Sequence, residues 1–108
     1  MKRGEVWWVN FDPSIGGEIK KRRPAVIISI DPFNKHSNRV QIIPLTSNVK
    51  KVYPSEAVVD LNGNKNKAMI DQIFTASKSR FGKKIGDLSL NNMNKIKNII
   101  LLHLGLDL

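Results

Sequence analysis

The chain has 108 residues, enough for one domain with a modest hydrophobic core, which we expect to span residues 1–108. It has no cysteine, which excludes disulfides and thiolate chemistry, and its apolar clusters are far shorter than the roughly 18 residues of a membrane span. Eighteen Lys and Arg against nine Asp and Glu give a formal charge of +9, which favours a polyanionic partner such as nucleic acid.

The N-terminal segment is basic at Lys2 and Arg3 but lacks the apolar stretch of a secretory signal, so we expect a cytoplasmic protein with no membrane partner. Residues 4–11 (GEVWWVNF) are aromatic and β-branched, which predicts a strand. Within a strand, at least one of Trp7 and Trp8 should face the core. Base stacking is the weaker alternative for either ring.

A loop and two strands are predicted next. Residues 14–22 hold two glycines and a run of cations, and we expect a mobile loop there. The apolar run 24–30 (PAVIISI) predicts a strand buried on both faces, with Pro24 as its first residue. Residues 39–45 predict a third strand, in which Pro44 implies an edge position or a bulge.

The second half of the chain ends in a helix. Residues 55–61 predict a fourth strand, and residues 67–74 predict a fifth that pairs with it across a turn at Asn62-Gly63. Helical spacing then predicts an amphipathic helix with Ser89 as N-cap and Gly105 as C-cap. Its apolar positions are Leu90, Met93, Ile96, Ile100 and Leu104. These elements indicate a mainly β (α+β) fold, a small antiparallel β-barrel closed by a C-terminal α-helix.

Residue types with catalytic chemistry are few. The two histidines, His36 in a predicted loop and His103 in the predicted helix, are too few for a His-based metal site, and no metal or phosphate-loop motif is present. We therefore expect no metal and no cofactor. The nine acids are scattered, which argues against a hydrolase with paired carboxylates.

Arg23 and Thr46 form the candidate site. Arg23 stands at the start of one predicted strand and Thr46 at the end of the next, so antiparallel pairing would bring them together. A guanidinium binds phosphate oxygens through two parallel hydrogen bonds, and a hydroxyl adds a short one, so the pair suits a phosphodiester. A solvated strand entry and an ordinary turn are the alternative explanation of these residues.

Several segments together resemble the MazF/PemK (Kid) family of type II toxin–antitoxin endoribonucleases: residues 4–18, RPAVIIS at 23–29, IPLTS at 43–47, Asp71-Gln72 and Ser79-Arg80. The resemblance implies a small SH3-like barrel of the CcdB/PemK type and a homodimer. It also implies metal-independent cleavage of single-stranded RNA, including mRNA, at short motifs. The implied partner is a cognate antitoxin whose acidic C-terminal tail covers the RNA-binding groove.

Four residues carry over as candidate catalytic groups. The arginine before proline corresponds to Arg23, the threonine of the P-x-T-[ST] motif to Thr46, and the acid of the mobile loop in some members to Glu18. Asp71 matches the acid of an Arg-x-Asp pair in one branch, but Met69 replaces its arginine, which shifts weight to Arg23 and Thr46. Attack by the 2′-hydroxyl of RNA would give a 2′,3′-cyclic phosphate and a 5′-hydroxyl. The proton carrier stays open between Glu18, Asp71 and a phosphate oxygen.

Other residues of the same segments are candidate RNA contacts: Lys20, Lys21, Arg22, Ser47, Lys50 and Lys51. Phosphate contacts of this kind add salt-dependent affinity without sequence information. We expect the cut motif to depend on residues 14–22 and 46–55. Two other classes of protein stay open. One is a gyrase-targeting, CcdB-like poison, which has no need of Arg23 and Thr46, and the other is an inactive RNA-binding homologue, which only Met69 supports.

Overall fold

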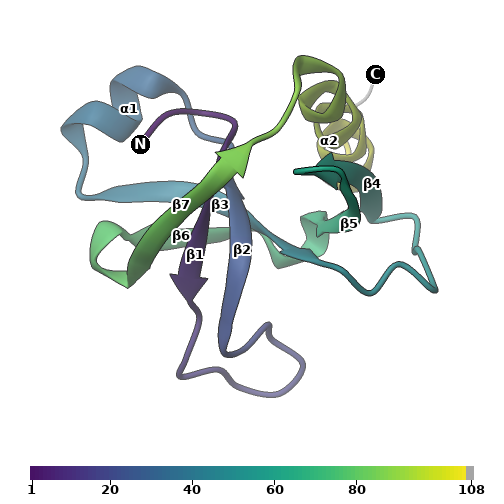
Figure 1. Cartoon of the computed structure of the whole chain (residues 1–108), viewed down its shortest axis with the longest axis horizontal. Coiled ribbons are helices and arrows are strands. Elements are labelled where there is room, and N and C mark those ends of the chain that lie inside the picture. Colours follow the sequence, from purple (N-terminus) through teal and green to yellow (C-terminus); the bar gives the residue numbers. More distant parts are fainter. Residues whose placement is uncertain (107–108) are drawn as a thin grey trace.

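The computed structural model describes residues 1–106 (Figure 1). Its elements in chain order are β1 (Glu5–Asn10), β2 (Arg22–Ile27), α1 (Asp31–His36), β3 (Arg39–Thr46), β4 (Glu56–Leu61), β5 (Asn64–Met69), the 3-10 turn η1 (Ile70–Gln72), β6 (Phe74–Ser77), the 3-10 turn η2 (Lys78–Arg80), β7 (Phe81–Asp87) and α2 (Leu90–His103). Neither helix in this part of the chain is both long and apolar enough to cross a bilayer.

The strands form one curled antiparallel sheet in the order β4-β5-β3-β2-β1-β7, with β6 attached to β3. Strand β3 is its centre. One edge of β3 pairs with β2, and the other pairs with β6 through residues 39–42 and with β5 through Leu45 and Thr46. The predicted mainly β fold with a C-terminal helix is therefore confirmed, as a half-barrel that divides at β3.

Two hydrophobic cores fill the two sides of this sheet. The first lies under α2 and contains Val6, Val26 and Ile43, and the second contains Val9 and Ala25. Successive residues of a strand point to opposite faces, so β2 supplies both cores. Residues 25–27 have no exposed surface, which confirms the prediction of a strand buried on both faces.

Pro24 lies inside its strand instead of at its start, and Pro44 lies in an inner strand instead of an edge strand. Pro24 is the third residue of β2, opposite Trp8 of β1, but the ladder to β3 begins only at Ala25. Pro44 is buried in the inner strand β3, between the residues that pair with β6 and those that pair with β5. At Pro24, β2 is paired with β1 only, and at Pro44, β3 is paired with β2 only. A proline, which has no N–H, is tolerated at such a position because no neighbouring strand needs a hydrogen bond from it on the open side.

The predicted fifth strand, 67–74, is wrong in extent. Asn62 and Gly63 have φ angles of 51° and 83°, which confirms the tight hairpin turn, but β5 then runs only from Asn64 to Met69. The turn η1 follows, and Phe74 begins β6. The helix α1 and the strands β6 and β7 were not predicted. Strand β7 (FGKKIGD) has two glycines and three charged residues and no alternating apolar pattern.

The helix α2 confirms the predicted C-terminal helix and its N-cap. The Ser89 hydroxyl accepts the Asn92 N–H at 3.1 Å. The C-cap is Leu104 rather than the predicted Gly105, which follows it with a φ of 69°. Met93 and Ile96 pack into the first core. The predicted apolar positions that lie exposed instead are Leu90 and Leu104.

Candidate active site

Arg23 and Thr46 lie across from each other at one end of β2 and β3. These strands pair Ala25 with Pro44, and the same antiparallel register, continued by two residues, puts Arg23 opposite Thr46. Residues two apart share a face of a strand, so Arg23 lies on the face that carries Ala25 and the second core. The backbone therefore has the juxtaposition that antiparallel pairing predicted.

The Arg23 side chain is half-buried and anchored by one hydrogen bond. Its Nε donates to the Lys20 carbonyl oxygen at 3.2 Å, and its backbone pairs with Val9 of β1. No carboxylate in residues 1–106 forms an ion pair with it. The terminal N–H groups of the guanidinium are therefore available to an anion such as phosphate.

The Thr46 hydroxyl is half-buried at the end of β3. Its Oγ1 accepts the Asn48 N–H at 3.2 Å, which leaves the hydroxyl proton for an acceptor outside the loop. On the other edge of β3, Thr46 pairs with Lys67 of β5. Ser47 follows as the first residue of an exposed loop.

The β1–β2 loop (residues 11–21) is tied down by two residues from the segment after β5. Gln72 accepts the Ile19 N–H at 3.2 Å and donates to the Gly17 carbonyl at 3.3 Å. Arg80 donates to two carbonyl oxygens at the start of the loop, both at 3.0 Å. Sequence analysis noted Gln72 and Arg80 only as part of a resemblance. Contacts of one side chain with distant backbone leave no pattern in a sequence.

Glu18 and Asp71 share a cavity, but Arg23 and Thr46 do not line it. This cavity, of about 250 Å³, lies between the β1–β2 loop and η1. A Glu18 carboxylate oxygen accepts the Ile15 N–H at 2.7 Å and so closes its own turn. The structure thus places the four candidate catalytic residues as two separate pairs, Arg23 with Thr46 and Glu18 with Asp71.

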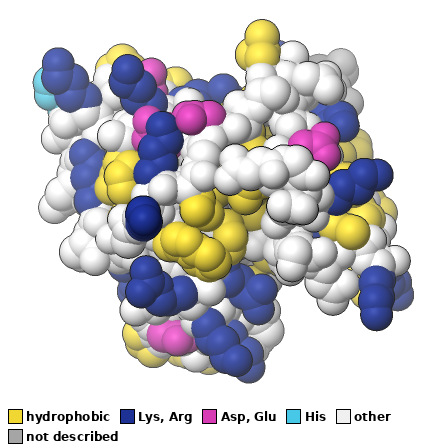
Figure 2. Space-filling model, in the orientation of Figure 1, with side chains coloured by type: hydrophobic (Ala, Val, Ile, Leu, Met, Phe, Trp, Pro, Cys, Tyr) yellow, Lys and Arg dark blue, Asp and Glu magenta, His cyan; other side chains and the backbone are white. Residues whose placement is uncertain are grey.

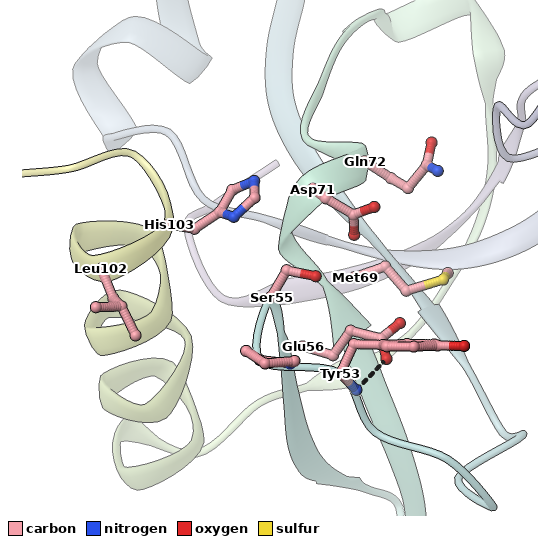
Figure 3. Close-up of a pocket in the computed structure, with 9 residues that line it drawn as sticks. Tyr53, Ser55, Glu56, Met69, Asp71, Gln72, Leu102 and His103 are labelled. Atoms are coloured by element: carbon pink, nitrogen blue, oxygen red, sulfur yellow. Dashed lines mark hydrogen bonds between the residues drawn. The ribbon is translucent and has the colours of Figure 1, made fainter.

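Asp71 also faces a larger cavity of about 570 Å³ between the β3–β4 loop and α2 (Figure 3). Tyr53 lines it from the β3–β4 loop, Met69 from the end of β5, and Leu102 and His103 from the helix. His103 reaches this wall because α2 packs against η1.

The candidate phosphate-binding cations are exposed on two loops. Lys20 and Lys21 lie in the β1–β2 loop, and Lys50 and Lys51 lie in the β3–β4 loop (residues 47–55). Figure 2 shows Lys and Arg gathered over both loops, with an apolar patch between them over β1 and β2. A strand of RNA that crosses this face would meet positive charge on either side of the patch.

Arg22 was predicted to belong to the loop, but it is the first residue of β2. Its guanidinium lies across Gly82 of β7, so closely that a Cβ atom at position 82 would be only 2.5 Å from Nη2 of Arg22. Trp8 lies beside the same position and is 36% exposed, whereas Trp7 packs edge-on against Phe81 at 6.1 Å. The prediction that at least one tryptophan faces the core is therefore confirmed by Trp7.

Comparison with known proteins identifies this arrangement. The family model for PemK-like, MazF-like toxins of type II toxin–antitoxin systems matches residues 2–104. The chain is 33% identical over 115 aligned residues to endoribonuclease MazF9 of Mycobacterium tuberculosis, with 98% of each chain covered. Its fold matches the crystal structure of MazF from Deinococcus radiodurans with a TM-score of 0.86 at 25% identity, covering 97% of this chain and 96% of that one.

An endoribonuclease of a mycobacterial species, solved with its cognate antitoxin, matches with a TM-score of 0.82 at 23% identity, covering 98% of this chain and 96% of that one. The curled half-barrel with its C-terminal helix is thus the MazF fold. The chain belongs to the PemK-like, MazF-like toxin family of type II toxin–antitoxin systems.

Proposed function

We propose that this chain is an endoribonuclease toxin that cleaves single-stranded RNA at short motifs without a metal ion. The observation that carries the proposal is the register that puts Arg23 across from Thr46, in a family member 33% identical to a protein named an endoribonuclease. RNA supplies its own nucleophile, the 2′-hydroxyl. The products are a 2′,3′-cyclic phosphate and a 5′-hydroxyl.

Arg23 and Thr46 hold the scissile phosphate in this mechanism. The free N–H groups of Arg23 bind the non-bridging oxygens and offset the charge that builds on them, and the Thr46 hydroxyl donates to the same group. The bound phosphate is thereby held in line between the 2′-oxygen and the leaving 5′-oxygen, an effect of orientation.

Proton transfer is assigned to other groups, because a guanidinium stays charged at physiological pH and is no base. Glu18 and Asp71, which share one cavity beside Gln72, are the carboxylate candidates. Direct transfer through a phosphate oxygen is the alternative. A pH–rate profile of Asp71→Asn and Glu18→Gln separates these routes, since loss of a base removes the acidic limb of the profile.

We infer that the natural inhibitor is an antitoxin with an acidic C-terminal tail, and that the toxin acts as a homodimer. A mycobacterial endoribonuclease of the same fold was solved with its cognate antitoxin. The cations over the β1–β2 and β3–β4 loops (Figure 2) give such a tail the same charge complement that they give RNA. Tail and substrate would therefore compete for one surface.

The decisive experiment incubates the protein with a long RNA in EDTA and maps the cut ends. We expect cleavage by the wild type and a loss of about 10²- to 10³-fold in rate for Arg23→Ala, as for removal of one preorganised donor. Thr46→Ala should lose rate in the same direction. Arg39→Ala is the control, because Arg39 is exposed at the opposite end of β3.

Three other results would each redirect the proposal. Cleavage only with added magnesium, or normal cleavage by Arg23→Ala, would contradict the mechanism. Trapped gyrase with intact RNA would identify a CcdB-like poison. RNA binding without cleavage by the wild type would identify an inactive homologue.

A further inference from the structure

We propose that Lys67 is a positioning residue that holds the β3–β4 loop against the sheet and thereby sets which RNA motif is cut. The inference rests on the proposed function and on the expectation that the cut motif depends on residues 46–55, which include this loop. Lys67 lies in β5, where its backbone pairs with Thr46 of β3 on one side and Val58 of the edge strand β4 on the other. It is thus the direct neighbour of a candidate catalytic residue.

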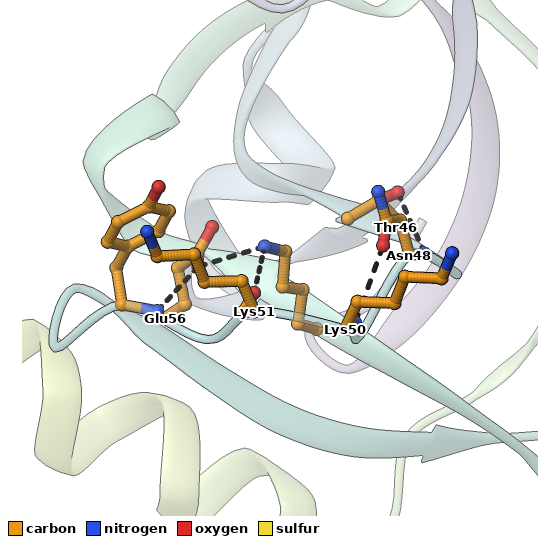
Figure 4. A network of polar contacts seen from close by, with 7 residues as sticks. Thr46, Asn48, Lys50, Lys51 and Glu56 are labelled. Carbon is orange, nitrogen blue, oxygen red and sulfur yellow. Dashed lines mark hydrogen bonds and ion pairs between the residues drawn. The ribbon is translucent and has the colours of Figure 1, made fainter.

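The Lys67 ammonium group ties the second half of the loop to β5 through Lys51 and Glu56, both labelled in Figure 4. Its Nζ donates to the Lys51 carbonyl oxygen at 2.7 Å and to Glu56 Oε1 at 3.0 Å. The same Glu56 oxygen accepts the Tyr53 N–H at 2.8 Å, and the Glu56 N–H donates to the Tyr53 carbonyl at 2.9 Å. One ammonium and one carboxylate oxygen therefore fix the main chain at two loop positions.

The first half of the loop is fixed from Thr46. Its hydroxyl accepts the Asn48 N–H at 3.2 Å, and the Asn48 side-chain oxygen accepts the Lys50 N–H at 3.4 Å. Both anchors thus start from Thr46 and Lys67, two residues that are paired across β3 and β5. The exposed side chains of the loop are therefore held at a set distance from the Thr46 hydroxyl.

Burial separates Lys67 from the other lysines of this region. Its side chain is 11% exposed and that of Glu56 is 8% exposed, and the Tyr53 ring lies 5.7 Å from Nζ. Its charge is satisfied inside the protein, whereas Lys50 and Lys51 are exposed. A buried ion pair adds little net stability, because desolvation offsets the attraction. Its main effect here is to select one loop conformation.

The test compares Lys67→Met with Lys65→Met, a lysine on the same strand that is exposed. Cut sites are mapped on a long RNA of mixed sequence. We expect the preference of Lys67→Met for the wild-type motif over sites with one changed base to fall about tenfold, the size of a moderate loss of specificity. The fold-loss in the cleavage rate of Lys67→Met at the wild-type motif should be smaller than the fold-loss in its preference for that motif. Lys67→Arg should restore the profile in part, and Lys65→Met should keep it.

A second variant covers the case in which Lys67→Met does not fold. Glu56→Gln keeps an oxygen for the Tyr53 N–H but removes the charge that Lys67 pairs with. We expect the same loss of selectivity from it. The double variant should lose less than the sum of the two single variants, because both disrupt the Lys67–Glu56 pair.

Hydrogen exchange of the Tyr53 amide tests the loop anchor without RNA, and Glu56→Gln or Lys67→Met should speed it about tenfold if the loop opens locally. An unchanged cut profile in a folded variant, or equal loss of rate at all sites, would overturn the selectivity role. Unchanged exchange would overturn the anchor itself. If the wild type cleaves no RNA, the proposed function and the selectivity role both fail, and the exchange result still decides the anchor.

Discussion

The four consecutive cations from Lys20 to Arg23 have four different environments. Lys20 is exposed and its carbonyl oxygen accepts from Arg23 Nε. Lys21 has a φ of 68° and donates its N–H to Asp12 at 2.9 Å. Arg22 lies across β7, and Arg23 is fixed in the ladder with free N–H groups. A uniform run of charge is thus divided by the backbone into solvated cations and one oriented guanidinium.

Glu5 gives a prediction about acid stability. Burial acts to raise its pKa, but hydrogen bonds from Trp7 and the Lys2 N–H, together with the charge of Lys84, lower the pKa below 4.5. A carboxyl with a lowered folded pKa stabilises the protein above its unfolded pKa, and this stability is lost as pH falls through the folded value. The effect is therefore fully present above about pH 4.5 and is lost as the pH falls below that value through the lowered pKa of Glu5.

We expect Glu5→Gln to reduce the free energy of unfolding by about 1 kcal/mol at pH 7, the usual net contribution of one hydrogen bond. Between pH 5 and pH 2, the free energy of unfolding should fall less for Glu5→Gln than for the wild type. Urea titrations at both ends of that range measure the difference. Asp87→Asn is the control, because Asp87 pairs with the same Lys84 but is 66% exposed. An equal acid slope in wild type and Glu5→Gln would contradict the prediction.

At the scale of elements, the sequence predicted the strands, turns and helices that have a recognisable pattern within their own residues. Strands β1 to β4, the Asn62-Gly63 turn and α2 have alternating, apolar or capping residues. Strand β7 is charged and has two glycines, so it becomes a strand only because β1 offers it a partner. Helix α1 is six residues long, too short for a helical period to register.

The candidate site was predictable to the same extent. Arg23 and Thr46 stand at the ends of neighbouring strands, so topology alone brings them together. Gln72 and Lys67 act on backbone groups of distant loops, and neither contact follows from residue type or spacing. The juxtaposition of Arg23 and Thr46 could be predicted, and the residues that hold the two loops beside them could not.

The role of Gln72 in holding the β1–β2 loop gives a prediction at this scale. Gln72→Leu removes both hydrogen bonds to the loop, so trypsin should cut after Lys20 and Lys21 about tenfold faster if the loop opens locally. RNA cleavage should slow because the same loop carries Glu18. Gln41→Leu is the control, since the Gln41 side chain donates to Thr75 of β6 instead, at 3.4 Å. Equal trypsin rates in all three proteins would show that Gln72 does not restrain the loop.

At the scale of the whole molecule, the chain carries a charge of +9, and on one face Lys and Arg lie on either side of an apolar patch (Figure 2). Cations on two loops flank the strand ends where Arg23 and Thr46 lie. Positive charge placed this way raises the rate at which RNA is captured, but it carries no sequence information. Affinity and cut motif should therefore respond to different residues.

Lys20→Ala tests that separation. Binding is measured on an RNA with a 2′-deoxy sugar at the cut position, which removes the nucleophile but keeps the phosphates. Loss of one phosphate contact should weaken binding and lower the slope of log affinity against log salt by about 0.7, the value for single strands. The cut motif on normal RNA should stay the same. Lys97→Ala, an exposed lysine on α2, should change neither quantity. A shifted motif in Lys20→Ala would mean that this cation contacts bases, and the charge run would then contribute to specificity as well as to affinity.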